Sequence, residues 1–101
     1  MTSSADTSRP DRLRRDARLP QGPAAVAAVF EPLLAEAAGP GTTPLSLTLD
    51  YGAAGIAGEA VRVEAGLDRA TRSLAFVSGD LVRVADGALL ASASAVFRRA
   101  G

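Results

Sequence analysis

One carboxylate, that of Glu31, stands out as a candidate for acid–base chemistry. The chain of 101 residues contains no cysteine and no histidine, which excludes disulfides, thiolate nucleophiles, Cys/His metal sites and an imidazole base. We therefore expect no metal, and any chemistry must use carboxylates, hydroxyls, amides or backbone dipoles. Glu31 lies inside the strongest helical pattern of the sequence, where it could serve as a general base or a nucleophile.

A second interpretation of Glu31 is that it is a solvated helix residue. At about 100° per residue, its side chain lies roughly 125° from the centre of the apolar stripe of that helix. Pro32 follows directly and could reorient the side chain by distorting the helix. Both interpretations stay open.

The residues before the helix could polarise a carbonyl group. In Gln21-Gly22-Pro23, Gly22 has a free N–H donor, Gln21 has an amide, and Pro23 has no N–H. The same three residues also make an ordinary helix start, so this pattern does not separate a binding role from a structural one.

Two more polar positions fall at the end of a predicted strand. Asp50 and Tyr51 face opposite sides of it, and we expect the Tyr51 ring to lie in the core or in an interface, with its hydroxyl reaching water. Ser92 and Ser94 alternate with alanines and have no base nearby in the sequence, so we interpret them as packing residues.

The helix that would position Glu31 is predicted over residues 23–38. Its apolar residues recur at the spacing that forms one stripe of a helix: Val26, Val29, Phe30, Leu33, Leu34 and Ala37. Pro23 suits the first helical position, and Gly39-Pro40 suits a left-handed cap followed by a stop. Pro32 inside the pattern predicts a kink or a break into two short helices.

After residue 41 the apolar period changes from 3.6 to 2, which predicts strands. The expected strands are residues 44–51, 59–67, 71–83 and 88–99, with a glycine-containing loop at 52–58 and turns at 68–70 and 85–87. Tight turns make the last three strands antiparallel. One long helix with such a sheet is an α+β domain.

Residues 1–20 are rich in Ser, Thr, Asp and Arg, and we expect them to form a flexible arm, with a domain over residues 21–101. A short helix over residues 11–18, on a partner surface, is the alternative. The net charge is zero, which gives no indication of nucleic acid binding. No apolar run approaches the roughly 18 residues of a membrane span, and no signal peptide is recognisable. We therefore expect a cytoplasmic protein.

Four segments, taken together, resemble a known family. They are a helix preceded by a Gly-containing turn, a strand ending in Asp-Tyr before a Gly/Ala loop, the strand GEAVRVEA, and the closing stretch VADGALLASASAVF. Their order resembles the hotdog-fold acyl-CoA thioesterases of the phenylacetate-pathway type over residues 21–99. The most specific part is Asp86-Gly87, followed by Leu90-Ala91 and then Phe97.

The resemblance implies a sheet wrapped around the helix, in a homodimer or a dimer of dimers, with an acyl-CoA or similar thioester bound at the dimer interface. It implies that the Gly22 N–H, beside Gln21, polarises the thioester carbonyl while Glu31 activates water or attacks directly. Tyr51 and Asp50 become candidate substrate-binding residues. Arg69 and Arg72 become candidate partners of the CoA phosphates. Coenzyme A would enter as part of the substrate, with no separate cofactor.

The chain differs from the family pattern at three places. Gln21-Gly22-Pro23 stands where the family has His-Gly-Gly, the position of the family's acidic residue is Phe30 rather than Glu31, and the polar first twenty residues are a poor candidate for the family's first strand. These differences favour an alternative function, a hotdog module that binds or scaffolds acyl groups without turnover. A hotdog dehydratase is a third option that the sequence disfavours, because that chemistry in the family relies on a histidine, which this chain lacks.

Overall fold

The computed structural model of the protein describes residues 12–100, which form one helix and five strands. In chain order the elements are β1 (Leu13–Arg18), α2 (Ala25–Ala38), β2 (Thr43–Tyr51), β3 (Ala60–Ala70), β4 (Leu74–Arg83) and β5 (Leu89–Arg98). The predicted helix and all four predicted strands are present, with small shifts at their ends.

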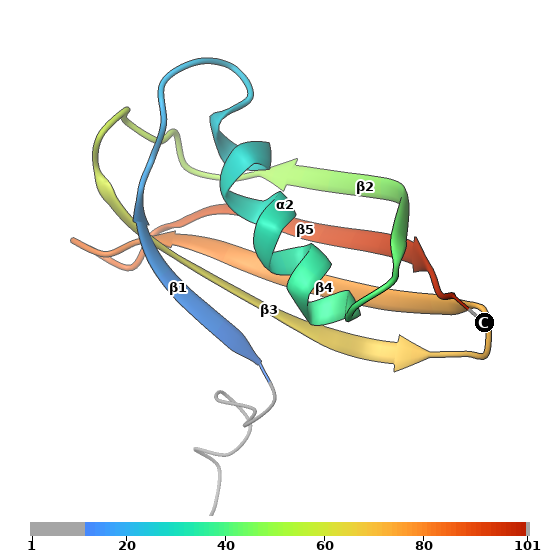
Figure 1. Cartoon of the computed structure of the whole chain (residues 1–101). Coiled ribbons are helices and arrows are strands. Elements are labelled where there is room, and N and C mark those ends of the chain that lie inside the picture. Colours follow the sequence, from blue (N-terminus) through green and yellow to red (C-terminus); the bar gives the residue numbers. More distant parts are fainter. Residues whose placement is uncertain (1–11, 101) are drawn as a thin grey trace, which may run out of the picture.

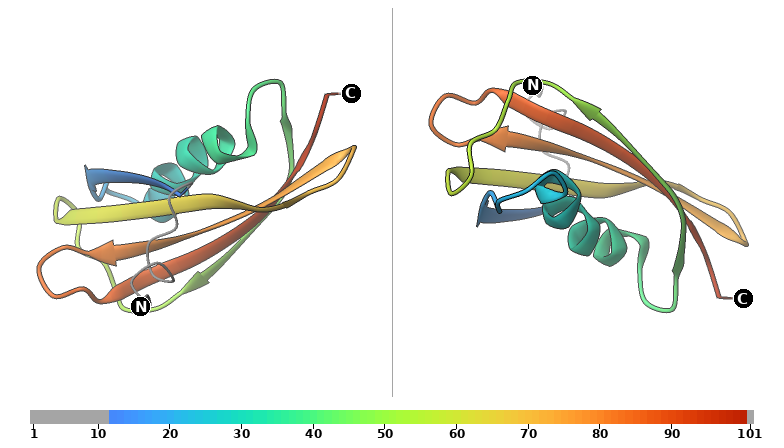
Figure 2. Two further views of the ribbon diagram at one scale, coloured as in Figure 1. Left: turned by 90° about the horizontal axis from the view of Figure 1, so that it is seen from below. Right: turned by 90° about the horizontal axis from the view of Figure 1, so that it is seen from above.

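The strands form one antiparallel sheet in the order β1-β3-β4-β5-β2. Hairpins join β3, β4 and β5, as predicted, whereas β1 and β2 occupy the two edges. Helix α2 crosses one face of the curved sheet, and no element within residues 12–100 covers the other face (Figure 1 and Figure 2). The predicted α+β architecture is confirmed, with five strands rather than four.

Strand β1 corrects the prediction for the start of the chain. It lies within the segment that we expected to be a flexible arm or a short helix, and it pairs with β3 from Leu13 opposite Ala65 to Arg18 opposite Ala60. An edge strand needs only one apolar side, and Leu13 and Ala17 supply it by packing against the core. Residues 1–11 of the predicted arm lie outside the described part of the chain.

The charges of β1, which argued against a strand, are matched by its neighbours. Arg14 Nε donates to Glu64 of β3 at 3.0 Å, and Arg62 Nε of β3 donates to Asp16 at 2.9 Å. On the other side of the strand, Arg15 pairs with Glu36 of the helix at 2.7 Å. Charged side chains on an edge strand also hinder pairing with another chain.

Helix α2 runs without interruption through Pro32, so the break that we considered there does not occur. Pro32 faces solvent, while Phe30, Leu33 and Leu34 beside it are buried. Packing on both sides of the proline therefore holds the helix together despite the lost backbone bond. The helix starts at Ala25, two residues after the predicted Pro23. At its other end, the N–H of Gly39, a residue with φ of 104°, donates to the carbonyls of Ala35 and Glu36.

The hairpin between β3 and β4 lies further along the chain than predicted. Strand β3 continues to Ala70 through a bulge between Leu67 and Arg69, so the turn falls at residues 71–73 instead of 68–70. Thr71 closes this turn, since its Oγ1 accepts a hydrogen bond from the Leu74 N–H at 3.0 Å. The Asp86-Gly87 turn between β4 and β5 is where the sequence predicts it.

The core lies between α2 and the sheet. Its largest fully buried side chains come from the helix and from three central strands: Phe30, Leu34, Leu81, Leu90, Val61, Val63 and Val77. The predicted small face of β5, Ala91, Ala93 and Ala95, is buried as well. Gly79 on β4 adds a residue without a side chain to this surface of small residues, and the Phe30 ring lies 3.3 Å from where a Gly79 Cβ would be.

Gly79→Ala is expected to destabilise the fold by about 1–3 kcal/mol, the usual cost of overpacking a core. An added Cβ would lie 2.3 Å from the backbone carbonyl oxygen of Glu64, an atom that moves only if two paired strands separate. Urea unfolding followed by circular dichroism measures the loss. Ser78→Ala, one residue away on the uncovered face, serves as the control, and an equal loss in both variants would contradict the close packing at Gly79.

Candidate active site

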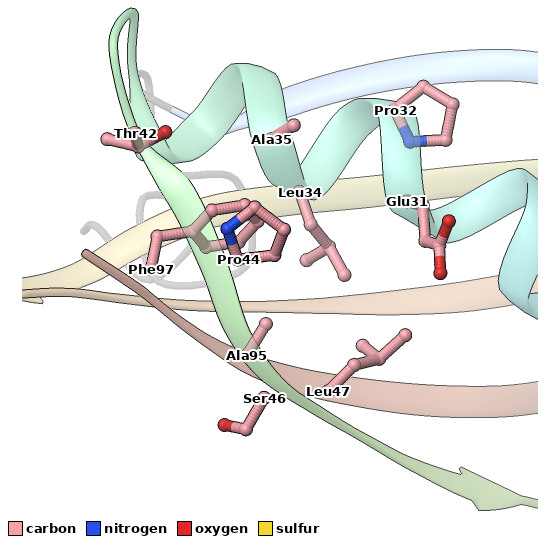
Figure 3. A pocket seen from close by; sticks show the side chains of 10 residues that line it. All are labelled: Glu31, Pro32, Leu34, Ala35, Thr42, Pro44, Ser46, Leu47, Ala95 and Phe97. Carbon is pink, nitrogen blue, oxygen red and sulfur yellow. The ribbon is translucent and has the colours of Figure 1, made fainter. Parts of the chain in front are cut away.

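An apolar groove runs between α2 and the edge strand β2. It has a volume of about 370 Å³ and is lined by Glu31, Pro32, Leu34, Ala35, Thr42, Pro44, Ser46, Leu47, Ala95 and Phe97. Figure 3 shows the Glu31 carboxylate at one end and the Phe97 ring beside Pro44 at the other. A groove of this size and character suits a small apolar group.

Glu31 is the acidic side chain of this groove. It is exposed, and no Arg side chain within residues 12–100 forms an ion pair with it. By contrast, Glu36, five residues later on the same helix, is paired with Arg15. The Glu31 carboxylate is therefore not engaged by the protein's described cations and lies beside an apolar surface.

A second pocket, which we call the N-terminal pocket, lies where α2 begins. It has a volume of about 450 Å³ and is lined by Leu19, Pro20, Gly22, Pro23, Ala25, Val26, Tyr51, Gly52, Ala53, Ala54, Gly55, Ala57 and Leu90. The pocket thus combines the start of the helix with the loop that follows β2. Gly22 is part of it and Glu31 is not, so one chain alone does not bring these two candidates into one pocket.

The start of α2, whose residues Gly22 and Val26 line this pocket, has N–H groups without a partner among the described residues. No side chain caps it, its first turn holds no acidic residue, and the N-cap residue is Ala24. The Ala25 N–H bonds to the Gly22 carbonyl, whereas the N–H groups of Val26 and Ala27 have no partner among the described residues. Free N–H groups and the positive end of the helix dipole favour a carbonyl oxygen or an anion here.

Solved structures with the same architecture give this arrangement a context. Thioesterase superfamily member 2 from zebrafish superimposes with a TM-score of 0.79 at 18% identity, covering 92% of this chain and 78% of that one. The phenylacetic acid degradation protein from Thermus thermophilus gives 0.79 at 20% identity, with coverage of 90% and 87%. The chain has the hotdog fold. The fold expected from the sequence motifs is thereby confirmed.

A third hotdog structure was determined with a ligand. It is a hypothetical thioesterase from Streptococcus pneumoniae with coenzyme A, which matches with a TM-score of 0.75 at 10% identity over 91% of this chain and 86% of that one. Identities this low show the fold alone. No protein-family model matches the sequence, and a comparison with curated proteins gives no match.

The remaining predicted residues are spread over the hotdog domain. Gln21 is exposed and lines neither the groove nor the N-terminal pocket. Tyr51 lines the N-terminal pocket, but 64% of it is exposed, so the core position considered for it is wrong for the single chain. Asp50 is exposed, and its place in the strand puts it on the sheet face away from the helix.

Arg69 and Arg72 lie at the far end of the sheet from Tyr51, around the β3–β4 hairpin. Arg69 stacks on the Phe76 ring, with its guanidinium carbon 4.8 Å from the ring centroid. Arg98 and Arg99, which the sequence did not single out, lie at the same end of the sheet. Arg98 is the last residue of β5, and Arg99 donates to the Thr71 carbonyl of the hairpin at 2.6 Å. Figure 1 shows the end of β5 beside this hairpin, where Arg98 is paired with Leu74.

We call these four residues, Arg69, Arg72, Arg98 and Arg99, the basic end. None of them forms an ion pair within residues 12–100. Arg98 directly follows Phe97 of the groove in β5, but side chains alternate along a strand, so the Arg98 side chain points to the face of the sheet away from the helix, where Arg69 stacks on Phe76. Sequence order alone could not have shown that a hairpin and the chain end meet.

A second group missed by sequence reasoning is the Glu59–Arg83–Asp86 cluster. Arg83 Nε donates to Glu59 Oε1 at 2.7 Å and Arg83 Nη1 donates to Asp86 Oδ2 at 3.3 Å. The hydrogen bonds from Arg83 and from the Ile56 N–H hold the pKa of Glu59 below its ordinary value. The Ala88 N–H, followed by the Arg83 charge, does the same for the pKa of Asp86.

These lowered pKa values predict an acid-sensitive contribution to stability. A carboxyl group whose pKa is lower in the folded state stabilises the fold fully above its unfolded pKa, about 4.3 for Glu and 3.9 for Asp, and loses that contribution as the pH falls through the folded pKa. As the pH is lowered past about 4.3, the melting temperature should therefore decrease. This decrease should be less steep in Glu59→Gln than in the wild type. Thermal melts between pH 7 and pH 3 check this, and parallel curves for both proteins would contradict it.

The described residues hold neither a metal-binding cluster nor a membrane-spanning helix. Within residues 12–100, no three His, Cys, Asp or Glu side chains gather in a way that could hold a metal ion. The one described helix, α2, is too short to cross a membrane.

Proposed function

We propose that the protein is a cytoplasmic thioesterase that hydrolyses an acyl-CoA thioester between two copies of the chain. One observation carries the proposal, namely that a hotdog domain holds a carboxylate without a described ion-pair partner, Glu31, in an apolar groove of about 370 Å³. The thioesterase structures that share its fold support the choice of reaction.

The edge strand β2 supports pairing of two copies. Leu45, Leu47 and Tyr51 on this strand are 47%, 36% and 64% exposed, and one side of its backbone has no neighbouring strand in the described chain. If the β2 strands of two copies paired antiparallel, they would cover both these exposed side chains and the unpaired backbone edge. The Tyr51 end of one copy, with its N-terminal pocket, would then face the Pro44 end of the other, with its groove. A homodimer, or a dimer of dimers built from it, follows.

Such a pairing would unite the two candidates that a single chain keeps apart. The thioester carbonyl would lie at the helix start of one copy, where the Gly22 N–H and the helix dipole stabilise negative charge on its oxygen. Glu31 of the other copy would take a proton from water as the water oxygen attacks the carbonyl carbon. The C–S bond then breaks, the thiolate leaves and is protonated, and the products are a carboxylic acid and the CoA thiol.

The basic end would hold the phosphates of coenzyme A. Its four guanidinium groups carry donors that suit phosphate oxygens, and it lies at the same end of the sheet as Phe97 of the groove. The acyl group or the pantetheine arm could then occupy the apolar groove while the charged nucleotide stays at the surface. Tyr51 would contribute to the wall of the thioester site.

A thiol-release assay tests the proposal. The purified protein is mixed with a panel of short aliphatic and aromatic acyl-CoA esters, and the freed thiol is measured with a colorimetric reagent. We expect saturable release from at least one ester. No release from any ester, with the folded state verified by circular dichroism, would overturn the proposed reaction.

The alternative is a hotdog module that binds an acyl group without turnover. It is favoured by Pro23, which gives no N–H donor at the helix start, and by Gln21, whose side chain lines neither the groove nor the N-terminal pocket. A binding module should gain thermal stability from CoA esters by mass action while releasing no thiol. That combination of results distinguishes it from the enzyme.

A further inference from the structure

The loop of residues 52–58 forms much of the wall of the N-terminal pocket. Five of its residues line that pocket: Gly52, Ala53, Ala54, Gly55 and Ala57. Their side chains are absent or single methyl groups, so the loop cannot anchor itself by filling the core. What holds the loop in place therefore determines the shape of the pocket.

Two side chains outside this loop, Glu59 and Arg83, hold its middle. Arg83 Nη2 donates to the Ala54 carbonyl at 2.6 Å, and Glu59 Oε2 accepts a hydrogen bond from the Ile56 N–H at 2.7 Å. The two side chains are joined by the 2.7 Å bond from Arg83 Nε to Glu59 Oε1, and they are only 18% and 16% exposed. One pair of opposite charges thus fixes two points of the loop.

The other contacts of the loop lie mostly at its ends. The Gly52 and Ala53 N–H groups donate to the carbonyls of Leu90 and Leu89, and the Gly58 N–H donates to the carbonyl of Leu19. A longer bond, 3.3 Å, runs from Arg18 to the Gly58 carbonyl. Between these ends, the polar contacts that reach the loop within residues 12–100 come from Glu59 and Arg83.

Close packing makes the position of the loop consequential. A Cβ built on Gly55 would lie 2.5 Å from Leu19 Cδ2 and 3.5 Å from Leu90 Cδ1, so the backbone of the loop rests directly on two side chains that also line the pocket. A loop released from Arg83 would change the space beside the helix start, where Gly22 and Val26 line the pocket.

We infer that Arg83 and Glu59 are positioning residues that fix the loop of residues 52–58 as the wall of the N-terminal pocket and thereby set how tightly a thioester substrate binds. The inference rests on the function proposed above. Neither residue touches the reacting atoms in that proposal. The two residues affect binding of the ground state and of the transition state equally. Their loss should therefore change KM and leave kcat unchanged.

Arg83→Met tests the inference, with Arg83→Lys as the variant that keeps the charge. A lysine has a single ammonium group and cannot reach Ala54, Glu59 and Asp86 at once, whereas methionine makes none of these bonds. Arg62→Met is the matched control, because Arg62 pairs with Asp16 at 2.9 Å and does not line the N-terminal pocket. All four proteins are compared by thermal melting so that the fraction folded is known.

Three readouts are used. Amide hydrogen exchange at Ile56 reports the loop itself, calorimetry with a non-hydrolysable butyl thioether of CoA reports binding, and steady-state kinetics with butyryl-CoA separates KM from kcat. We expect Arg83→Met to speed exchange at Ile56 and to raise both Kd and KM by about tenfold, as the loss of a charged hydrogen bond implies, with kcat within about twofold. The exchange rate, Kd and KM of Arg83→Lys should lie between those of the wild type and of Arg83→Met. The values of Arg62→Met should match those of the wild type.

Unchanged exchange at Ile56, or an unchanged Kd for the thioether, would overturn the inference. A fall in kcat at constant KM would also overturn it, because that is the signature of a smaller folded fraction. A wild type that binds the thioether but hydrolyses no ester would refute the proposed reaction alone, since the exchange and Kd comparisons would still decide the role of Arg83. A wild type that binds no thioether would overturn the role of the pair in substrate binding.

Discussion

Glu31→Ala is expected to lower thioester turnover by about two to four orders of magnitude, the range for loss of a positioned general base. The helix should survive the change, because Glu31 is exposed and forms no ion pair within residues 12–100. The reduction should fall on kcat, since the carboxylate acts on the attacking water rather than on substrate binding. Thiol release from the best acyl-CoA ester measures it.

Two further variants make this result specific. Glu31→Gln keeps the shape of the side chain and removes its basicity, so it should be nearly as inactive as Glu31→Ala. Glu36→Gln removes a carboxylate from the same helix that is paired with Arg15 and lies outside the groove, and its activity should stay close to that of the wild type. Full turnover in Glu31→Ala would exclude this residue as the base and would favour the binding module.

Phe30→Ala is expected to have the largest effect on stability, about 3–5 kcal/mol. The ring is fully buried and reaches to 3.3 Å from the position of a Gly79 Cβ. The residue of β4 beneath the ring is Gly79, which has no side chain that could fill the space that the ring leaves. A loss of this size is a large share of the roughly 5–15 kcal/mol that stabilise a typical domain. Urea unfolding at fixed protein concentration measures it.

Phe76→Ala is the control for this experiment. Phe76 is the same residue type on the uncovered face of the sheet, where it is half-buried and stacks with Arg69. Its loss should cost about 1 kcal/mol, from partial burial and one cation–π contact. Similar losses in the two variants would show that α2 does not rest on the sheet through Phe30.

The elements that the sequence predicts correctly are those with one apolar face. Helix α2 and strands β3, β4 and β5 each bury a periodic set of residues, so local patterns suffice to find them. The same alternation predicted β2, although Leu47 and Tyr51 of that strand stay exposed in the single chain. Strand β1 has no such run. Its charges are neutralised by residues far away in the chain, as in the pair of Asp16 with Arg62, and no local pattern can show that. The turn at residues 71–73 was displaced by a bulge between Leu67 and Arg69, an irregularity of the cross-strand register that no local pattern predicts.

The candidate site was only partly predictable for the same reason. Glu31 and Gly22 could be named from their places in and before a helix, but the sequence does not say that they line two separate pockets of one chain. Arg99 and Arg83 were missed because their importance comes from contacts with Thr71 and Ala54, which belong to other turns. A search of the sequence for arginines near predicted turns would have included Arg83.

The two edges of the sheet differ in a way that limits growth of the assembly. Strand β2 offers exposed leucines to another copy, whereas β1 presents Arg14 and Asp16, each already paired with β3. Two copies joined through β2 would form a continuous sheet of ten strands with a β1 at each end, since each chain contributes five. Further addition of chains would have to bury those ion pairs, which is costly. A dimer built through β2 would therefore stay a closed pair rather than grow into an open fibre.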